Sequence, residues 1–161
     1  MHMTPFYKDI KTYFEGSRFK YIVSGSQYGL VTNLIHYLNH ISYLNQSSEY
    51  TTDTSFLDKK LIKSKRKGFY ELTGTCQVNF KNGTQGFINC ESEGNSPVLI
   101  QAFNDKVHFI LSESKGTVLI SKSENDWKWE ELEYEFPFQS QLTTSLVKDL
   151  LKDKSCSLPS Y

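Results

Sequence analysis

Two histidines at a helical spacing are the first residues in this chain that could do chemistry. His36 and His40 lie four positions apart, so on a helix they share one face, and an imidazole pair at that spacing can chelate a metal ion. A zincin-type site would also need a glutamate between them and a third ligand close by, and the sequence offers neither. We therefore predict solvent-facing histidines, no metal and no other cofactor.

A dense run of basic residues could bind anions. The run consists of Lys59, Lys60, Lys63, Lys65, Arg66 and Lys67. These side chains could contact phosphates while Phe69 and Tyr70, which follow them, stack on bases. The alternative is a solvated linker. Because the 18 basic and 18 acidic residues cancel, bulk charge does not favour nucleic acid, and we expect at most weak nucleic-acid binding.

A stretch of opposite charge surrounds the two tryptophans. The predicted partner-binding residues here are Trp127, Trp129, Glu130, Glu131, Glu133 and Tyr134. Large aromatic side chains supply much of the energy of protein contacts, and acidic residues around them would suit a partner with a basic surface. The alternative is that one tryptophan belongs to the core and the acids decorate an exposed strand.

Motifs for catalysis are missing from the sequence. It contains no Gly-x-Ser-x-Gly, no phosphate-binding loop of the Walker type and no Gly-x-Gly-x-x-Gly dinucleotide fingerprint. Carboxylates that converge in a sheet concavity leave almost no local signature, so catalysis stays open, although the balance favours a protein that is not an enzyme.

Length, charge and cysteine content indicate the general class. At 161 residues the chain can form one domain with a real core, predicted over residues 1–154, with a loose tail at 155–161. Cys76, Cys90 and Cys156 are an odd number without metal-ligand spacing, which favours a reducing compartment. No apolar run reaches the length of a membrane span and the start does not resemble a signal peptide, so we expect a soluble cytoplasmic protein.

The predicted fold is α+β, with two N-terminal helices, an antiparallel meander of about six strands over residues 69–136, and a C-terminal helix. Alternation of apolar and polar residues from 70 to 80 indicates a strand with one buried face. At Lys81-Asn82-Gly83 we favour a three-residue loop with Gly83 left-handed, which pairs Val78 with Gly86.

Two further features are predicted within the meander. A turn at Asn104-Asp105 pairs Ala102 with Val107, and a shift in the apolar phase predicts a bulge near residues 130–131.

The helices are predicted from apolar residues at helical spacing. The first begins at Pro5, capped by Thr4, and ends before Gly16. The second covers residues 30–44, with His36 and His40 on its other face. Ser140 is predicted to cap the final helix. Between the helices, residues 19–23 are predicted to form a short strand at a sheet edge, and residues 45–55 a polar loop.

From these features we predict a non-catalytic protein-interaction module, such as an inhibitor, immunity protein, adaptor or secretion chaperone, that uses the acidic-aromatic strand. The first alternative is a protein that binds or transforms an apolar small molecule between sheet and helix, because the element order resembles the helix-grip class and the cystatin-like or NTF2-like class. Weak nucleic-acid binding through the basic run is the third possibility.

Overall fold

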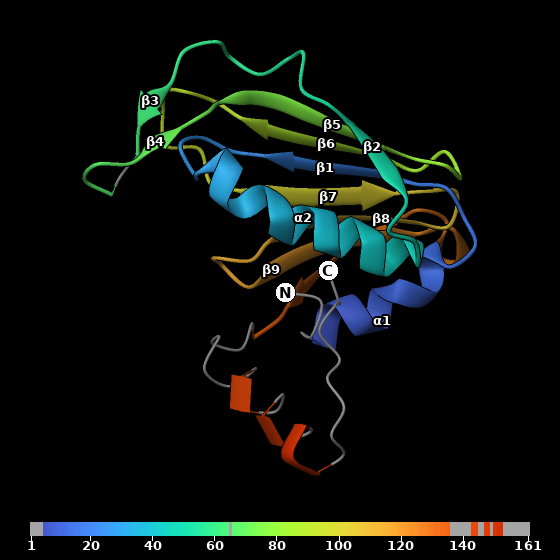
Figure 1. Ribbon diagram of the computed structural model, residues 1–161. Helices are drawn as coiled ribbons and strands as arrows, with labels where there is room; N and C mark the ends of the chain where they lie inside the picture. The colour runs from blue at the N-terminus through green and yellow to red at the C-terminus, as the bar shows by residue number, and fades with distance from the viewer. Residues whose placement is uncertain (1–4, 65, 136–142, 145–146, 149, 153–161) are drawn as a thin grey trace.

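The protein folds around an eight-stranded mixed sheet, with helices α1 and α2 on one face (Figure 1). The computed structural model describes residues 5–64, 66–135, 143–144, 147–148 and 150–152. The elements in chain order are α1 (Pro5–Phe14), β1 (Lys20–Ser24), α2 (Leu30–Asn45), β2 (Tyr50–Asp53), β3 (Ile62–Lys63), β4 (Tyr70–Glu71), β5 (Gly74–Phe80), β6 (Gln85–Cys90), β7 (Leu99–Phe103), β8 (Val107–Ser112), β9 (Thr117–Lys122), the 3-10 turn η1 (Ser123–Asn125) and β10 (Trp129–Glu133).

The predicted antiparallel meander is wrong, because strand β1 inserts into the middle of the sheet. The order is β10-β9-β8-β7-β1-β6-β5-β2. Strand β1 runs parallel to β6 and antiparallel to β7, so residues 19–23 are not an edge strand as predicted. Tyr21 and Val23 on β1 are fully buried. With hydrogen-bonding neighbours on both sides, β1 separates the segment predicted as one continuous meander into two antiparallel groups.

The hairpin of β5 and β6 has the predicted register. Val78 lies opposite Gly86 and Gly74 lies opposite Cys90. Gly83 has a φ of +89°, which confirms the left-handed residue in a three-residue loop. Cys76 and Cys90 are buried free thiols.

The second hairpin is shifted by two residues from the prediction. Ala102 lies opposite Phe109 rather than Val107. The cause is Asn104, whose side-chain oxygen accepts hydrogen bonds from the backbone N–H groups of Lys106 and Val107 at 2.9 and 3.0 Å. This arrangement lengthens the turn without moving any side chain to the other face, because the shift is even.

The predicted bulge is replaced by a turn that precedes the strand. Asp126 and Trp127 have φ angles of +51° and +58°, and β10 then pairs with β9 without interruption from Trp129 to Glu133. Trp129 and Leu132 therefore lie on opposite faces of one regular strand, and no bulge is needed between them.

The core lies between the sheet and the two helices. Both helices have nearly the predicted bounds, and their apolar stripes supply fully buried residues such as Phe6 and Phe14 on α1 and Ile41 and Leu44 on α2. Helix α2 packs closely on β6, where a Cβ on Gly86 would lie 2.6 Å from Ile41.

One further segment differs from the prediction, and the predicted C-terminal segments lie largely or wholly outside the described residues. The polar loop predicted at 45–55 contains β2, which pairs with the outer side of β5. The predicted final helix from Ser140 lies largely outside the described residues, and the predicted tail at 155–161 lies wholly outside them. Among the described residues no helix has the length and apolarity needed to cross a membrane.

Candidate functional site

The candidate site is a groove between the first turns of α2 and the small hairpin formed by β3 and β4, which we call the α2–hairpin groove. Its volume is about 510 Å³. The side chains used below are Gln27, Tyr28, Thr32, Asn33, His36, Lys63, Arg66, Phe69, Tyr70 and Glu71, all of which line it.

Glu71 fixes the geometry of the groove by joining β4 to the start of α2. Its carboxylate accepts hydrogen bonds from the backbone N–H of Val31 and the hydroxyl of Thr32, both at 3.2 Å. A carboxylate at a helix N-terminus satisfies otherwise unpaired N–H groups and interacts favourably with the helix dipole. Glu71 is only 8% exposed. Its hydrogen bond with Val31, which is 40 residues away in the sequence, joins the hairpin to the helix.

Gly29 explains why this cap has to come from a distant residue. It occupies the N-cap position of α2 with a φ of +80° and provides no side-chain hydrogen bond. A Cβ at this position would lie 2.7 Å from the Thr32 hydroxyl and 3.2 Å from a Glu71 carboxylate oxygen. Asn33 completes the turn by donating hydrogen bonds to the carbonyls of Tyr28 and Gly29 at 2.8 and 2.9 Å.

The hairpin supplies positive charge and aromatic rings to the groove. Of the six basic residues predicted to bind anions, Lys63 and Arg66 line the groove, whereas Lys59, Lys60 and Lys67 do not, and Lys65 lies outside the described residues. Phe69 and Tyr70 are 63% and 61% exposed. The basic run is thus a hairpin next to a helix rather than a plain linker, and whether it binds anions stays a prediction.

The two histidines have different environments, although both lie on α2. His36 is exposed in the groove. His40 is fully buried, with its Nδ1 3.0 Å from the hydroxyl of Tyr21 and its ring 4.0 Å from that of Tyr7. The prediction of two solvent-facing histidines is therefore wrong for His40, whose position is also too deep for a shared solvent-facing site.

A metal cluster is not found in the described part of the chain, where no group of three or more His, Cys, Asp or Glu side chains is arranged to hold an ion. The absence of a metal stays a prediction.

The predicted partner-binding residues do not form one surface. Trp129 pairs with Ser121, and Glu130 pairs with Ile120, so neighbouring residues of β10 point to opposite faces of the sheet. Trp129 is 51% exposed and lies edge-on to His108 at 5.0 Å on the face without helices. Tyr134 instead packs against Phe6 of α1 at 5.1 Å.

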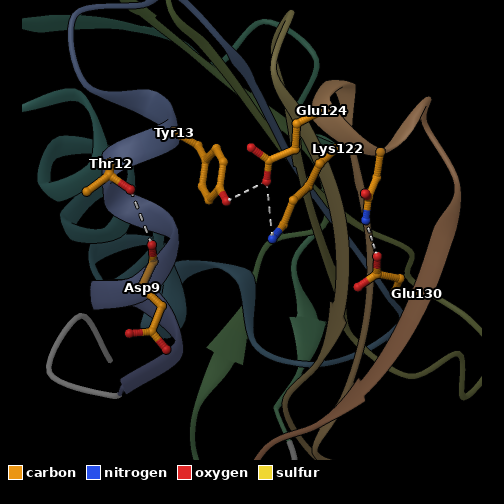
Figure 2. Close-up of polar contacts among 7 residues, drawn as sticks. Asp9, Thr12, Tyr13, Lys122, Glu124 and Glu130 are labelled. Carbon is orange, nitrogen blue, oxygen red and sulfur yellow. Dashed lines mark hydrogen bonds and ion pairs between the residues drawn. The ribbon is translucent and has the colours of Figure 1, made fainter.

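Some of the acidic residues near the tryptophans have partners inside the molecule. Figure 2 shows Glu124 accepting a hydrogen bond from the Tyr13 hydroxyl at 3.4 Å and pairing with Lys122 at 3.7 Å. Glu130 accepts a hydrogen bond from the Asn125 amide. Trp127 is 44% exposed. Binding of a partner by the remaining exposed residues stays a prediction.

Sequence reasoning missed Glu71, which the alternation from 70 to 80 assigned to the wet face of a strand. In the structure Tyr70 is exposed and Glu71 is buried, because β4 belongs to the small hairpin and the main-sheet strand begins at Gly74. The one signal in the sequence was weak: Gly29 has no side chain to cap the helix predicted from residue 30, so its first N–H groups need an acceptor from solvent or from elsewhere in the chain.

The fold is similar to that of several solved oxidoreductases. A UDP-N-acetylglucosamine 3-dehydrogenase from Acidithiobacillus ferrooxidans matches 96% of this chain with a TM-score of 0.67 and 9% identity, covering 51% of its own chain. A protein from Desulfitobacterium hafniense, described as an NADPH-dependent oxidoreductase, matches 99% with a TM-score of 0.66 and 10% identity, covering 55% of its own chain. A dehydrogenase from Clostridium difficile matches 94% with a TM-score of 0.61 and 9% identity, covering 52% of its own chain.

These similarities define a fold and no more. The chain spans about half the length of these solved structures. A scan against protein-family models and a search of curated proteins each gave no match.

The comparisons overturn the predicted function. A non-catalytic inhibitor, immunity protein, adaptor or chaperone was expected, whereas the similar structures are oxidoreductases. The helix-grip and cystatin-like or NTF2-like alternatives also fail, since the mixed sheet with a central parallel strand pair does not have their order.

The described residues do not form a dinucleotide site of the kind that NAD(P)-dependent enzymes use. Such a site needs a mainly parallel sheet with helices on both faces and a glycine-rich turn that leads into a helix. Here β1 and β6 are the one parallel pair of strands in the described sheet, α1 and α2 share one face, and the turn before α2 reads Ser-Gly-Ser-Gln-Tyr-Gly.

Proposed function

We propose that this chain is the ligand-binding part of an oxidoreductase-type protein and that the α2–hairpin groove binds a small anionic molecule that carries hydroxyl groups. The observation that carries the proposal is the composition of the groove. Cations, hydrogen-bonding side chains and exposed aromatic rings line one concave space of about 510 Å³, a size typical of small-molecule sites.

The anionic part of the ligand would contact the hairpin. Lys63 and Arg66 present an ammonium and a guanidinium to the groove. Arginine can bind a phosphate or carboxylate through two parallel hydrogen bonds, and lysine adds a point charge. The Glu71 carboxylate also lines the groove, but it is directed to the start of α2, where it accepts hydrogen bonds from Val31 and Thr32.

The hydroxyl-bearing part would contact α2. The exposed side chains of Thr32 and His36 lie one helical turn apart on the groove wall. A neutral imidazole has one ring nitrogen that donates a hydrogen bond and one that accepts, so His36 is a groove residue suited to contact a bound hydroxyl. Phe69 and Tyr70 offer exposed faces on which a planar ring could stack.

The similar structures support this choice of ligand class. One of them is a dehydrogenase that acts on UDP-N-acetylglucosamine, a molecule that combines a planar base, phosphates and sugar hydroxyls. Dinucleotide-dependent chemistry would require residues other than those described. The free thiols of Cys76 and Cys90 support a reducing, cytoplasmic setting for the protein.

Calorimetric titration with UDP-N-acetylglucosamine as the probe tests the proposal. Removing two charged contacts by Lys63→Ala with Arg66→Ala should weaken binding at least tenfold, about 1.4 kcal/mol or more. The matched control is Lys59→Ala with Lys60→Ala, which removes the same charge from the same basic run outside the groove and should change binding less than threefold.

Two results would contradict the proposal. One is the absence of heat or chemical-shift change with UDP-N-acetylglucosamine, UDP and inorganic phosphate at millimolar concentration. The other is an equal loss of affinity in both double variants, which would mean that the probe senses net charge and does not occupy the groove.

A further inference from the structure

A second cavity lies beside the α2–hairpin groove and has a different chemistry. Its volume is about 300 Å³. It is lined by Tyr28, Asn33, Tyr37, Val98, Ile100, Glu113 and Ser114. Tyr28 and Asn33 also line the groove, so the two spaces share a wall at the start of α2. Helix α2, the approach to β7 and the turn between β8 and β9 thus meet here.

Glu113 places negative charge in this cavity. It lies in the β8–β9 turn, is half-buried, and its carboxylate accepts a hydrogen bond from the Tyr7 hydroxyl at 3.1 Å. Burial raises the pKa of Glu113 above its ordinary value, because a carboxylate is poorly solvated at this site. The nearby carboxylate also contributes to the raised pKa of Tyr37 and Tyr21, after the larger effect of burial.

Two tyrosine rings form an aromatic corner in the same space. The rings of Tyr28 and Tyr37 lie 6.1 Å apart at an angle of 87°. The Tyr28 hydroxyl donates a hydrogen bond to the Asn89 carbonyl at 2.9 Å, which fixes its ring. Val98 and Ile100 add apolar walls. Aromatic faces attract cations through the ring quadrupole, most strongly where water is displaced.

We propose that this second cavity binds a compact organic ammonium ion, with Glu113 as the counter-charge and Tyr28 and Tyr37 as the aromatic walls. Each part of such a ligand would contact a group of matching chemistry in the cavity. The positive nitrogen would lie between the carboxylate and the rings, and its alkyl groups would contact Val98 and Ile100. A small inorganic cation would leave the apolar walls unused, and a neutral ligand would make no use of the charge of the carboxylate.

The affinity of the cavity for an organic cation should depend on pH. The cation binds the ionised carboxylate, so affinity should rise as pH increases through the raised pKa of Glu113. The titratable groups that face Glu113 are Tyr7 from α1, Tyr21 from β1 and Tyr37 from α2, all with pKa values raised by burial. They stay neutral in the range of interest. The N-terminal amine, whose positive charge lowers the pKa of Glu113 against the larger effect of burial, and His40, which lies next to Tyr7 and Tyr21, are further ionisable groups near Glu113.

Choline chloride and 3,3-dimethylbutan-1-ol are a matched pair of probes for this site, since they have nearly the same shape and differ in charge. Two-dimensional NMR titration of the full chain should show choline binding at least fivefold tighter than the alcohol at pH about 7.5. Resonances of the Tyr28 and Tyr37 rings should shift.

Glu113→Gln is the decisive variant, because it removes the charge and retains an acceptor oxygen for Tyr7. It should weaken choline binding at least tenfold, abolish its pH dependence and leave alcohol binding unchanged. Glu93→Gln, the same substitution at an exposed site outside the cavity, should have no effect.

Equal binding of choline and the alcohol would overturn the proposal, as would Glu113→Gln binding choline like the unmodified protein. A pH dependence that persists in this variant would mean that a group other than Glu113 titrates, and it would also overturn the proposal. These outcomes do not depend on the groove, because Lys63→Ala with Arg66→Ala should leave choline binding intact.

Discussion

Replacing Glu71 by alanine should destabilise the protein and detach the β3–β4 hairpin from α2. The change removes a carboxylate that accepts two hydrogen bonds, one from the Val31 N–H and one from the Thr32 hydroxyl, both at 3.2 Å. The Val31 N–H then lacks its acceptor at the start of a helix whose N-cap residue, Gly29, offers no side chain.

The expected cost is about 2 kcal/mol of unfolding free energy. Loss of an N-cap acceptor costs about 0.5 to 2 kcal/mol, and loss of a negative charge at a helix N-terminus adds about 0.3 to 1 kcal/mol. The bond from the Val31 N–H is at the long end of the normal range, and the Thr32 hydroxyl also lies 3.1 Å from the Gly29 carbonyl, a second acceptor. The middle of the combined range is therefore appropriate. Glu71→Gln retains an acceptor and loses the charge, so its cost should be about half as large.

Urea unfolding followed by circular dichroism measures these values. With a slope of about 2 kcal/mol per molar, typical of a small domain, Glu71→Ala should lower the unfolding midpoint by about 1 M at constant slope. Glu93→Ala, an exposed carboxylate, should shift it by less than about 0.25 M.

The double variant of Glu71→Ala with Thr32→Val tests the contact itself. Since the two side chains are bonded, the two costs should not add, and the double variant should be more stable than their sum predicts by at least about 0.5 kcal/mol. A Glu71→Ala cost below about 0.5 kcal/mol, or strictly additive costs, would refute the capping role of Glu71.

Three further predictions use other features of the fold. Gly29→Ala should cost about 1 kcal/mol more than Gly16→Ala in urea unfolding, because both residues have positive φ but only at Gly29 does a Cβ meet other atoms within 4 Å. Asn104→Ala should cost about 2 to 3 kcal/mol in the same assay, since its amide also donates to the Tyr13 carbonyl at 2.7 Å; a cost below about 1 kcal/mol would contradict its role in the turn. Burial lowers the pKa of His108, so its contribution should make unfolding easier as pH falls from about 6.5 through the lowered value. Comparison with His108→Gln isolates this effect, which should be absent above about pH 7.5.

The local features of this fold could be predicted from the sequence because neighbouring residues determine them. Helix α1 begins at Pro5 and helix α2 at Leu30, as their apolar spacing indicates. The β5–β6 register follows from keeping apolar residues on one face, with Gly83 in the left-handed conformation that the loop requires.

The sheet order could not be predicted in the same way. The alternation of apolar and polar residues in a strand shows which face is buried, but it does not show which strands lie on either side. Neither β1 nor β2 pairs in the sheet with a strand that is next to it in the sequence. Residues 19–23 have the same alternation whether they form an edge or the centre. The pairing of Tyr21 with both Gly86 and Ala102 depends on segments more than 60 residues away.

The candidate site depends on that same long-range order. Strand β1 leads directly into α2 and, because β1 is central, it sets the start of the helix at one end of the sheet. The chain then crosses to the far edge as β2 before the basic hairpin returns to the helix start, where Glu71 meets Val31. The contact of Glu71 with the helix start thus helps to place Lys63 and Arg66 of the same hairpin beside the groove. A sequence pattern over ten or fifteen residues shows the basic run but not the contact between Glu71 and Val31, because these two residues are 40 positions apart.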